Sequence, residues 1–347
     1  MSDLYPFLMI PEFSPRPWGT RDLRPIYTRV VGKEPIGEAW LTGDECRVAN
    51  GPFSGASLSN LCQRFGRELI GEAAPQPGRF PLLTKFLFPH DKLSVQVHPD
   101  DEGARELGQP CGKTECWYVA KCLPGAQVGL GLTPGVGKAE FEAAILANRA
   151  ENLLNWVDLN QGDLIYCDAG TVHSIGPGSI LIETQQNSDT TFRLYDFGRG
   201  RELHIEQGLR AMRESTNAGK VSPRTIGGHD GVPDARRSGA WRGRLLVASP
   251  CFVVEHFAIT KPLTLSAAPG RTSAQVLVAV EGSAVVEWEG GQPVSFNRGE
   301  AVVIPASIEQ IGLRPQWAVE FLLMRVPGEP VQPPVVEKLT EGVRTPE

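Results

Sequence analysis

Short runs of β-branched and aromatic residues alternate along this chain with turns rich in glycine and proline. In the first two thirds the runs lie at 82–88, 93–97, 115–122, 163–168, 179–184 and 190–197. Residues 241–326 repeat the pattern in the runs LLVAS, FVVEHFAI, AQVLVAVEG, SAVVEWEG, EAVVIP and VEFLLMRV. Runs of this length and spacing are typical of all-β sandwiches and barrels. We therefore expect a mainly β protein.

Helical periodicity is confined to three segments of the N-terminal part. In residues 55–71 apolar side chains recur at helical spacing, and Ser57 is a plausible N-cap. Residues 100–107 open with acidic side chains, which favour a helix N-terminus, and residues 138–149 form the third segment. The polar, glycine-rich residues 216–239 predict a linker or a long loop.

The two β-rich parts contain related segments. Residues 162–173 read GDLIYCDAGTVH and residues 299–310 read GEAVVIPASIEQ. Both resemble the strand-turn-strand signature Gly-x5-Pro-x-Gly-x-x-His of a cupin-like barrel. The first copy has Asp168 in place of proline and ends in His173, whereas the second keeps Pro305 and ends in Gln310.

This repeat predicts two cupin-type β-barrels of the jelly-roll kind, with a few helices inserted in the N-terminal part. We expect a catalytic domain over residues 1–240, a degenerate cupin domain over 241–327 and a C-terminal tail over 328–347. Because the second copy lacks the histidine, we expect the second barrel to bind no metal.

Composition and charge exclude several classes of protein. The 347 residues carry 34 basic and 40 acidic side chains, a net charge of -6, so there is no basic surplus for nucleic-acid binding. No apolar stretch is long enough to span a membrane, and the N-terminus does not look like a signal peptide. Seven scattered cysteines without a CxxC pair indicate reduced thiols and a cytoplasmic location rather than a cysteine zinc site.

Polar residues with metal-binding atoms occur in strand-like surroundings. Gln96 and His98 are two residues apart in LSVQVHPDD, so they share one strand face, as do Lys113 and Glu115 in KTECWYV. His173 ends the first cupin-like turn. Two imidazoles, a carboxylate and a carboxamide from three segments suit zinc, and also iron(II) or manganese. The alternative is that each histidine is an ordinary buried residue without a ligand role.

A further polar group lies in residues 179–199. On the strand TTFRLYDF, alternation places Thr191, Arg193 and Tyr195 on one face, opposite Phe192 and Leu194. A buried arginine needs an anionic partner. One possibility is a structural ion pair of Arg193 with Glu183. The other is a functional pair, in which Glu183 moves protons and Arg193 stabilises negative charge.

Taken together, these motifs resemble the type I phosphomannose isomerases, which are zinc enzymes of the cupin superfamily. The resemblance covers most of the chain. It rests on PRPWGT (15–20), LLTKFLFPHDKLSVQVHPDD (82–101), GKTECWYV (112–119), AGTVHSIG (169–176) and QQNSDTTFRLYDFGR (185–199). At this length the chain resembles the compact bacterial branch, which lacks the large helical insertion.

The resemblance implies one Zn²⁺ per chain, with ligands at Gln96, His98, Glu115 and His173, and catalytic roles for Arg193, Glu183 and Lys113. It implies an aldose-ketose isomerase that interconverts D-mannose 6-phosphate and D-fructose 6-phosphate by proton transfer through a cis-enediol(ate). The expected partner is this small sugar phosphate, and the expected state is a monomer or homodimer. Alternatives are another metal-dependent sugar or sugar-phosphate isomerase, a cupin dioxygenase, or a non-catalytic sugar-binding cupin.

Overall fold

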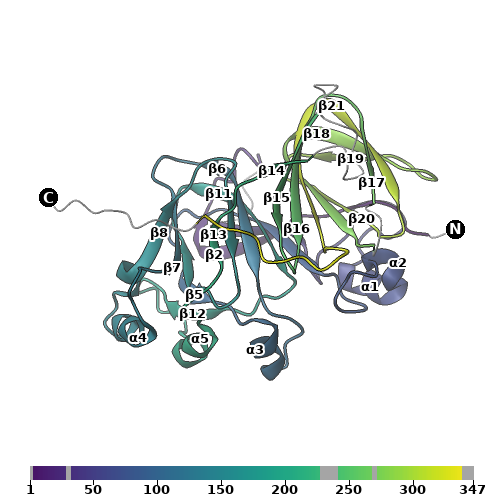
Figure 1. The fold of residues 1–347 in the computed structure, drawn as a ribbon. Helices are drawn as coiled ribbons and strands as arrows, with labels where there is room; N and C mark the ends of the chain where they lie inside the picture. Colours follow the sequence, from purple (N-terminus) through teal and green to yellow (C-terminus); the bar gives the residue numbers. More distant parts are fainter. Residues whose placement is uncertain (1–2, 29–32, 227–240, 268–271, 338–347) are drawn as a thin grey trace. The chain divides into compact units, whose positions relative to one another are not determined.

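The computed structural model describes residues 3–28, 33–226, 241–267 and 272–337 (Figure 1). The chain divides into two compact units. Unit 1 consists of Met1–Leu87, Glu183–Asn187 and Pro223–Pro334, and unit 2 of Phe88–Ile182, Ser188–Ser222 and Val335–Glu347. Antiparallel strands dominate both units, and helices are short and few, which confirms the prediction of a mainly β, cupin-type fold.

Unit 1 contains a nine-stranded sheet, which we call the second barrel. Its main path is β1-β20-β18-β21-β16-β15-β14, while β17 pairs with β21 and β19 with β18. The strands are β1 (Phe7–Leu8), β14 (Arg224–Thr225), β15 (Trp241–Ala248), β16 (Val253–Ile259), β17 (Leu263–Ser266), β18 (Gln275–Glu287), β19 (Val294–Asn297), β20 (Ala301–Ile304) and β21 (Gln310–Arg325).

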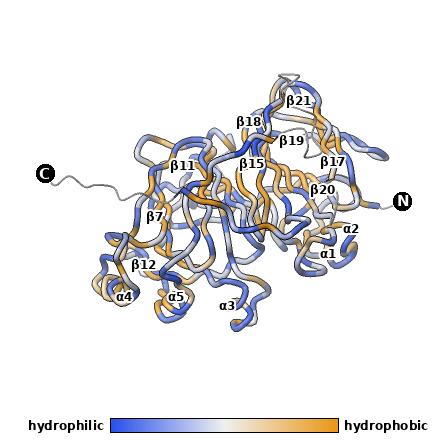
Figure 2. Tube along the Cα trace, viewed as in Figure 1, coloured by the Kyte–Doolittle hydropathy of each residue, from blue (hydrophilic) through white to orange (hydrophobic). Residues whose placement is uncertain are grey.

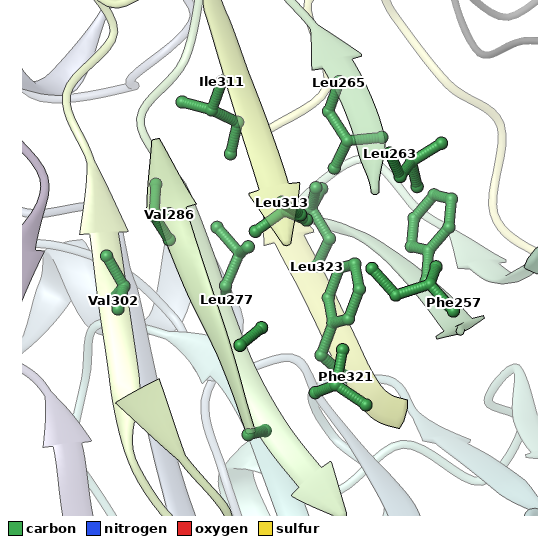
Figure 3. Packing of buried hydrophobic residues seen from close by; sticks show 14 of the residues in the cluster. Phe257, Leu263, Leu265, Leu277, Val286, Val302, Ile311, Leu313, Phe321 and Leu323 are labelled. Atoms are coloured by element: carbon green, nitrogen blue, oxygen red, sulfur yellow. The ribbon is translucent and has the colours of Figure 1, made fainter. Parts of the chain in front are cut away.

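The core of the second barrel is made by alternate residues of these strands. Figure 3 shows Phe257 of β16, Leu277 of β18 and Phe321 and Leu323 of β21 packed together with Leu265 of β17. The rings of Phe257 and Phe321 stack with centroids 5.2 Å apart. Figure 2 shows the same preference along the chain, because hydrophobic stretches follow the strands.

Strand β18 of the second barrel is longer than the sequence predicts. AQVLVAVEG and SAVVEWEG form one strand, β18, instead of two. The pairing register with β21 shifts between Gly282 and Ala284, so a bulge absorbs the irregularity. Gly282 has φ 76°, and a Cβ there would lie 2.1 Å from the carbonyl oxygen of Ala318. Glycine therefore allows the strand to continue where we expected a turn.

The rest of unit 1 includes β2 (Glu12–Thr20), β3 (Ile36–Thr42) and β4 (Leu82–Leu87), which follow one another in a sheet. The predicted helix over 55–71 is present as α1 (Leu58–Phe65) and α2 (Arg67–Ile70), and the Ser57 side chain caps α1 by accepting from the Asn60 amide. Strands β2 and β3 were not predicted from the sequence. Pro15 and Pro17 interrupt β2, which lies at the end of the strand order, where proline is tolerated.

Unit 2 contains two antiparallel sheets. One has the order β12-β5-β10-β7-β8, and the other includes β13-β9-β6-β11. The strands are β5 (Val95–Val97), β6 (Glu115–Cys122), β7 (Gln127–Leu132), β8 (Leu154–Asp158), β9 (Leu164–Cys167), β10 (His173–Ile175), β11 (Ser179–Gln186), β12 (Phe192–Tyr195) and β13 (Ala218–Lys220). From Glu183 onwards β11 belongs to unit 1.

The helices of unit 2 are α3 (Asp101–Glu106), α4 (Lys138–Leu146), α5 (Ile205–Ala211) and the 3-10 helix η1 (Ala150–Leu153). The first two were predicted, and α5 was not. No helix in the described ranges is long and apolar enough to cross a bilayer.

The predicted linker over 216–239 is wrong for its first part, because β13 and β14 lie there and pair with β9 and β15. Residues 227–239 of that linker, and residues 338–347 of the predicted C-terminal tail, lie outside the described residues.

Candidate metal centre and active site

The strands of unit 2 bring the predicted metal ligands together from three segments. His173 is the first residue of β10 and lies directly opposite Gln96 of β5. His98 follows the end of β5, and Glu115 is the first residue of β6 in the other sheet of the unit. Residues that face each other across an antiparallel pair point to the same side, so Gln96 and His173 share one face.

Three of these side chains form a tight buried cluster. The Oε1 atom of Glu115 lies 3.1 Å from Nε2 of His173 and 3.5 Å from Nε2 of His98. The two imidazole centroids are 4.9 Å apart. His98 is 2% exposed, Glu115 0% and His173 1%. Their potential ligand atoms all lie within 4.8 Å of one another, which is close enough for one ion to contact all three.

Backbone carbonyls orient both imidazoles. Nδ1 of His98 lies 2.9 Å from the Thr190 carbonyl oxygen, and Nδ1 of His173 lies 3.0 Å from that of Thr171. A carbonyl oxygen can only accept, so each Nδ1 carries the proton and each Nε2 keeps its lone pair. The two lone pairs therefore lie on the Nε2 atoms, which are the ring atoms nearest to Glu115. Metal-bound histidines are usually held in this way by a partner at the second ring nitrogen.

The unsatisfied atoms of the cluster fit a bound cation. Both carboxylate oxygens of Glu115 are buried without a hydrogen bond of good geometry from any described residue. Its Oε1 faces two nitrogen lone pairs, an arrangement of acceptors that is unfavourable unless a positive charge lies among them. Two imidazoles and a carboxylate are a common ligand set for zinc. The residues present therefore suit a divalent metal ion.

Burial and local charge keep these groups in the protonation states that metal binding needs. Burial, together with the Lys113 ammonium, lowers the pKa of His98 to about 3. Burial also lowers the pKa of His173. For Glu115, burial alone would raise the pKa, but Lys113 and the two imidazoles outweigh it and hold this pKa well below its usual range. Neutral imidazoles and an ionised carboxylate are the forms that bind metals.

Gln96 and Lys113 border the cluster. Gln96 directs Nε2 to His173 Nε2 at 3.1 Å, while its Oε1 lies 3.2 Å from the Ser94 hydroxyl, so here the amide presents a donor to the cluster. Lys113 is 3% exposed, and its ammonium lies 3.0 Å from Glu115 Oε2 and 3.1 Å from His98 Nε2. Lys113 is thus the positive charge nearest to the three candidate ligands in the described part of unit 2.

Arg193 lies beside this cluster in the same sheet. It pairs with Gln96 across β12 and β5, so its side chain leaves the sheet on the face shared by Gln96 and His173. Its Nη1 donates to the Glu202 carbonyl at 2.8 Å, whereas the buried Nε has no hydrogen-bond partner in the described residues. Burial and the neighbouring Arg201 lower the pKa of Arg193. An arginine with an unused donor on this face suits an anionic ligand.

The predicted alternation along β12 fails at Tyr195. The register shifts between Arg193 and Tyr195, and Tyr195 lies opposite Val95 instead of continuing the face of Arg193. Tyr195 therefore packs in the same hydrophobic cluster as Phe192 and Leu194. A bulge reverses the side on which the following residue points, which strict alternation does not foresee.

Glu183 lies on β11, the strand next to β6 in the sheet order, and its ion-pair partner is Lys85 of β4. Lys85 Nζ is 3.0 Å from Glu183 Oε1 and 3.7 Å from Glu38 Oε1, and these side chains are almost fully buried. Arg16 and the Trp40 indole both donate to Glu38 at 2.8 Å. The carboxylates of Glu183 and Glu38 thus share a buried ammonium.

Lys85 and Glu38 are absent from the sequence prediction, although a signal exists for the lysine. All six residues of β4 are buried, and Lys85 is the one charged residue in LLTKFL. A charged side chain inside such a strand must have a partner, because burying an unpaired charge costs too much. Glu38 gives no such signal, since its role depends on a strand pairing between β3 and β4.

The fold and the buried His–Glu–His cluster define a cupin with a centre suited to a divalent metal. The model of the phosphomannose isomerase type I catalytic domain matches residues 19–118. The chain is 32% identical over 320 residues to the mannose-6-phosphate isomerase of Streptococcus mutans, covering 88% of this chain and 93% of that protein. It is also 39% identical over 220 residues to ManA of Bacillus subtilis, covering 60% of this chain and 68% of the relative.

The crystal structure of the Bacillus subtilis mannose 6-phosphate isomerase is similar throughout, with a TM-score of 0.78 at 28% identity. The match covers 92% of this chain and 99% of that one. The chain belongs to the type I phosphomannose isomerase family.

Proposed function

We propose that this protein interconverts mannose 6-phosphate and fructose 6-phosphate with the help of one divalent metal ion. The observation that carries the proposal is the buried cluster of His98, Glu115 and His173, in which Glu115 Oε1 faces the Nε2 atoms of both imidazoles and the ligand atoms of all three residues lie within 4.8 Å of one another. Similarity to a mannose-6-phosphate isomerase over most of the chain supports the same activity.

We propose His98, Glu115 and His173 as the residues that hold the metal, with zinc as the ion. Gln96 is proposed as a fourth ligand. To bind the metal, its side-chain amide must rotate so that the oxygen, which now faces Ser94, points toward the cluster. A divalent ion bound there would supply Lewis acidity toward the carbonyl or hydroxyl oxygens of the sugar. Lys113 already provides positive charge at the same place, within 3.1 Å of two of the ligands.

The reaction needs a group that moves a proton between two carbon atoms. In open-chain mannose 6-phosphate, a base removes the proton from C2, next to the C1 aldehyde, which leaves a cis-enediol(ate). Return of a proton to C1 and movement of the O2 hydroxyl proton to O1 give the ketose. We propose Glu183 as this base. The Lys85 ammonium 3.0 Å away favours the ionised carboxylate, which is the form that accepts a proton.

Arg193 and Lys113 are proposed to stabilise the negative charge of the substrate. The enediolate places charge on oxygen, and the phosphate carries more. A guanidinium with a free N–H suits either group, whereas the Lys113 ammonium acts as a compact point charge. Both side chains lie next to the candidate ligands in unit 2, which supports a role in contacting a molecule bound there.

Other features of the protein stay predictions. They are a catalytic domain over residues 1–240 supported by 241–327, a cytoplasmic location, and a monomeric or homodimeric state.

The activity is tested by incubating the purified full chain with mannose 6-phosphate and following fructose 6-phosphate by a coupled assay. We expect product, loss of turnover after chelation, and recovery when zinc is added back. Turnover that persists in protein freed of metal would overturn the metal dependence. Absence of product with any added divalent ion would overturn the proposed substrate.

A further inference from the structure

One edge of the five-stranded sheet of unit 2 is held by a histidine that the reaction proposed above does not use. Strand β12 lies at the end of the strand order β12-β5-β10-β7-β8. Arg193 lies on this strand, opposite Gln96 of β5. Both main-chain polar groups of Arg193 bond to His204. The placement of the arginine therefore depends on a residue eleven positions further along the chain.

His204 takes the place of a neighbouring strand. Its backbone N–H donates to the Arg193 carbonyl oxygen at 2.7 Å, as the N–H of a strand residue would. The Arg193 N–H donates in turn to Nδ1 of the His204 ring at 3.2 Å. The imidazole thus supplies the acceptor that a further strand would provide with a carbonyl oxygen. An apolar side chain at this position would leave the Arg193 N–H without this acceptor.

This contact determines which nitrogen of the His204 ring carries the proton. An amide N–H can only donate, so Nδ1 keeps its lone pair and the proton of the neutral ring lies on Nε2. The candidate metal ligands His98 and His173 have the opposite arrangement, because their Nδ1 atoms donate to carbonyl oxygens. His204 therefore uses its ring as an acceptor toward the backbone, which separates its role from that of the candidate ligands.

The same short segment also holds the far end of the Arg193 side chain. Nη1 of Arg193 donates to the Glu202 carbonyl oxygen at 2.8 Å. Residues 202 and 204 therefore contact the arginine at its guanidinium and at its main chain. Because both ends are held, few rotamers remain for the side chain between them. These bonds fix how the guanidinium is presented on the sheet face that Gln96 and His173 share.

Helix α5 anchors His204 itself. The His204 carbonyl oxygen accepts from the Gly208 N–H at 2.8 Å, so this residue begins the first turn of the helix. A Cβ at Gly208 would lie 2.5 Å from Cδ2 of Leu194, because α5 packs closely on β12. The ring centroids of His204 and Phe192 are 6.4 Å apart. The helix thus fixes the histidine against the strand that carries Arg193.

We propose that His204 is a positioning residue for Arg193. Its ring and backbone hold the main chain of the arginine, so that the guanidinium meets the negative charge of the bound substrate in one orientation. A misplacement of about 1 Å in an active site can lower the rate about 100-fold. The proposal rests on the function proposed above, in which Arg193 acts on the anionic sugar phosphate. The alternative is that His204 only stabilises the edge of the sheet.

Kinetics with mannose 6-phosphate separate these two roles. We expect His204→Ala to lower kcat/KM roughly 10–100-fold. His204→Asn should keep most of the activity, because its side-chain oxygen can accept from the Arg193 N–H. In an Arg193→Ala background, His204→Ala should have little further effect, since no guanidinium is left to position. Tyr195→Phe is the matched control, because it removes a hydrogen bond from the same strand to the Asn148 carbonyl and leaves the contacts of Arg193 intact.

Two NMR measurements test the contact without using turnover. Correlation of ¹H and ¹⁵N in the histidine rings of the parent should show the His204 proton on Nε2, and the His204→Asn spectrum identifies this ring by its absence. Exchange of the Arg193 amide proton with solvent should be slow in the parent and in His204→Asn, and roughly tenfold faster or more in His204→Ala. The ring measurement does not need His204→Ala, so it still decides if that variant does not fold.

Three outcomes would overturn the proposal. One is a His204 proton on Nδ1 in the parent. Another is a folded His204→Ala protein with the parental kcat/KM. A third is that His204→Ala lowers kcat/KM by the same factor in the parent and in Arg193→Ala, which would make His204 structural. A parent without isomerase activity would instead overturn the proposed function, and the NMR measurements would still decide whether His204 holds Arg193.

Discussion

Replacement of Lys85 by methionine tests the buried charge cluster of unit 1. The change removes an ammonium that lies 3.0 Å from Glu183 and 3.7 Å from Glu38, and leaves two carboxylates in a site less than a tenth exposed. Arg16 still pairs with Glu38, so the greater loss of opposing charge falls on Glu183. Breaking a buried ion pair from one side costs about 3–5 kcal/mol.

The expected effect is large enough to measure by thermal unfolding. Domains of 150–250 residues lose roughly 2–4 °C for each kcal/mol, so Lys85→Met should lower the unfolding temperature by roughly 10 °C. Glu183→Gln should lower the free energy of unfolding by less, because Lys85 keeps Glu38 as a partner. The double variant Lys85→Met/Glu183→Gln removes both charges of the pair. Its loss of unfolding free energy should therefore be smaller than the sum of the two single losses by about 1–3 kcal/mol.

Arg314→Met is the control, since it removes a cation from the exposed Arg314–Glu287 pair and should cost less than about 1 kcal/mol. Turnover of mannose 6-phosphate should fall in both Lys85→Met and Glu183→Gln. Strict additivity of the two stability losses, or a Lys85→Met protein as stable as the Arg314→Met control, would refute the reasoning from the shared ammonium.

Three further predictions concern the metal centre. Arg193→Ala should lower kcat/KM by roughly 10²–10³-fold while metal stays bound, and metal analysis that shows loss of the ion would make the residue structural. Gln96→Leu should weaken metal affinity roughly 10–100-fold in a chelator competition. His98→Ala should weaken metal affinity more, and equal losses of affinity in the two variants would contradict this prediction. Burial lowers the pKa of His98 to about 3 from 6.5, so between these pH values the unfolded chain binds more protons than the folded one. Metal-free protein should therefore lose stability as the pH falls below 6.5. In urea titrations, His98→Asn should reduce this pH dependence.

Much of the fold could be predicted because its signals are local. Alternating apolar residues gave most strands, and the Ser57 cap marked the first helix. Local patterns could not show Tyr195 on the core side of β12, because the bulge that places it there depends on pairing with β5. They also could not show β18 as one strand, since Gly282 looks like a turn until its partner strand is known.

The candidate site shows the same limit. Strand alternation put Gln96 with His98, and Lys113 with Glu115, on shared strand faces, and the resemblance to the isomerase family implied that these segments meet with His173 at one metal. The carbonyls of Thr171 and Thr190 that orient the imidazoles leave no mark in the sequence, since any residue supplies a carbonyl. The ion pair of Glu183 with Lys85 joins residues almost a hundred positions apart, so only the folded chain reveals it.

The most direct test of the metal centre is elemental analysis of purified protein, together with the variants His98→Ala and His173→Ala. We predict about one divalent ion per chain in the parent and loss of both the ion and the isomerase activity in each variant, while circular dichroism shows a folded protein. A His173→Ala protein that isomerises mannose 6-phosphate at the parental rate without metal would contradict the account, as would a parent protein that holds two ions per chain.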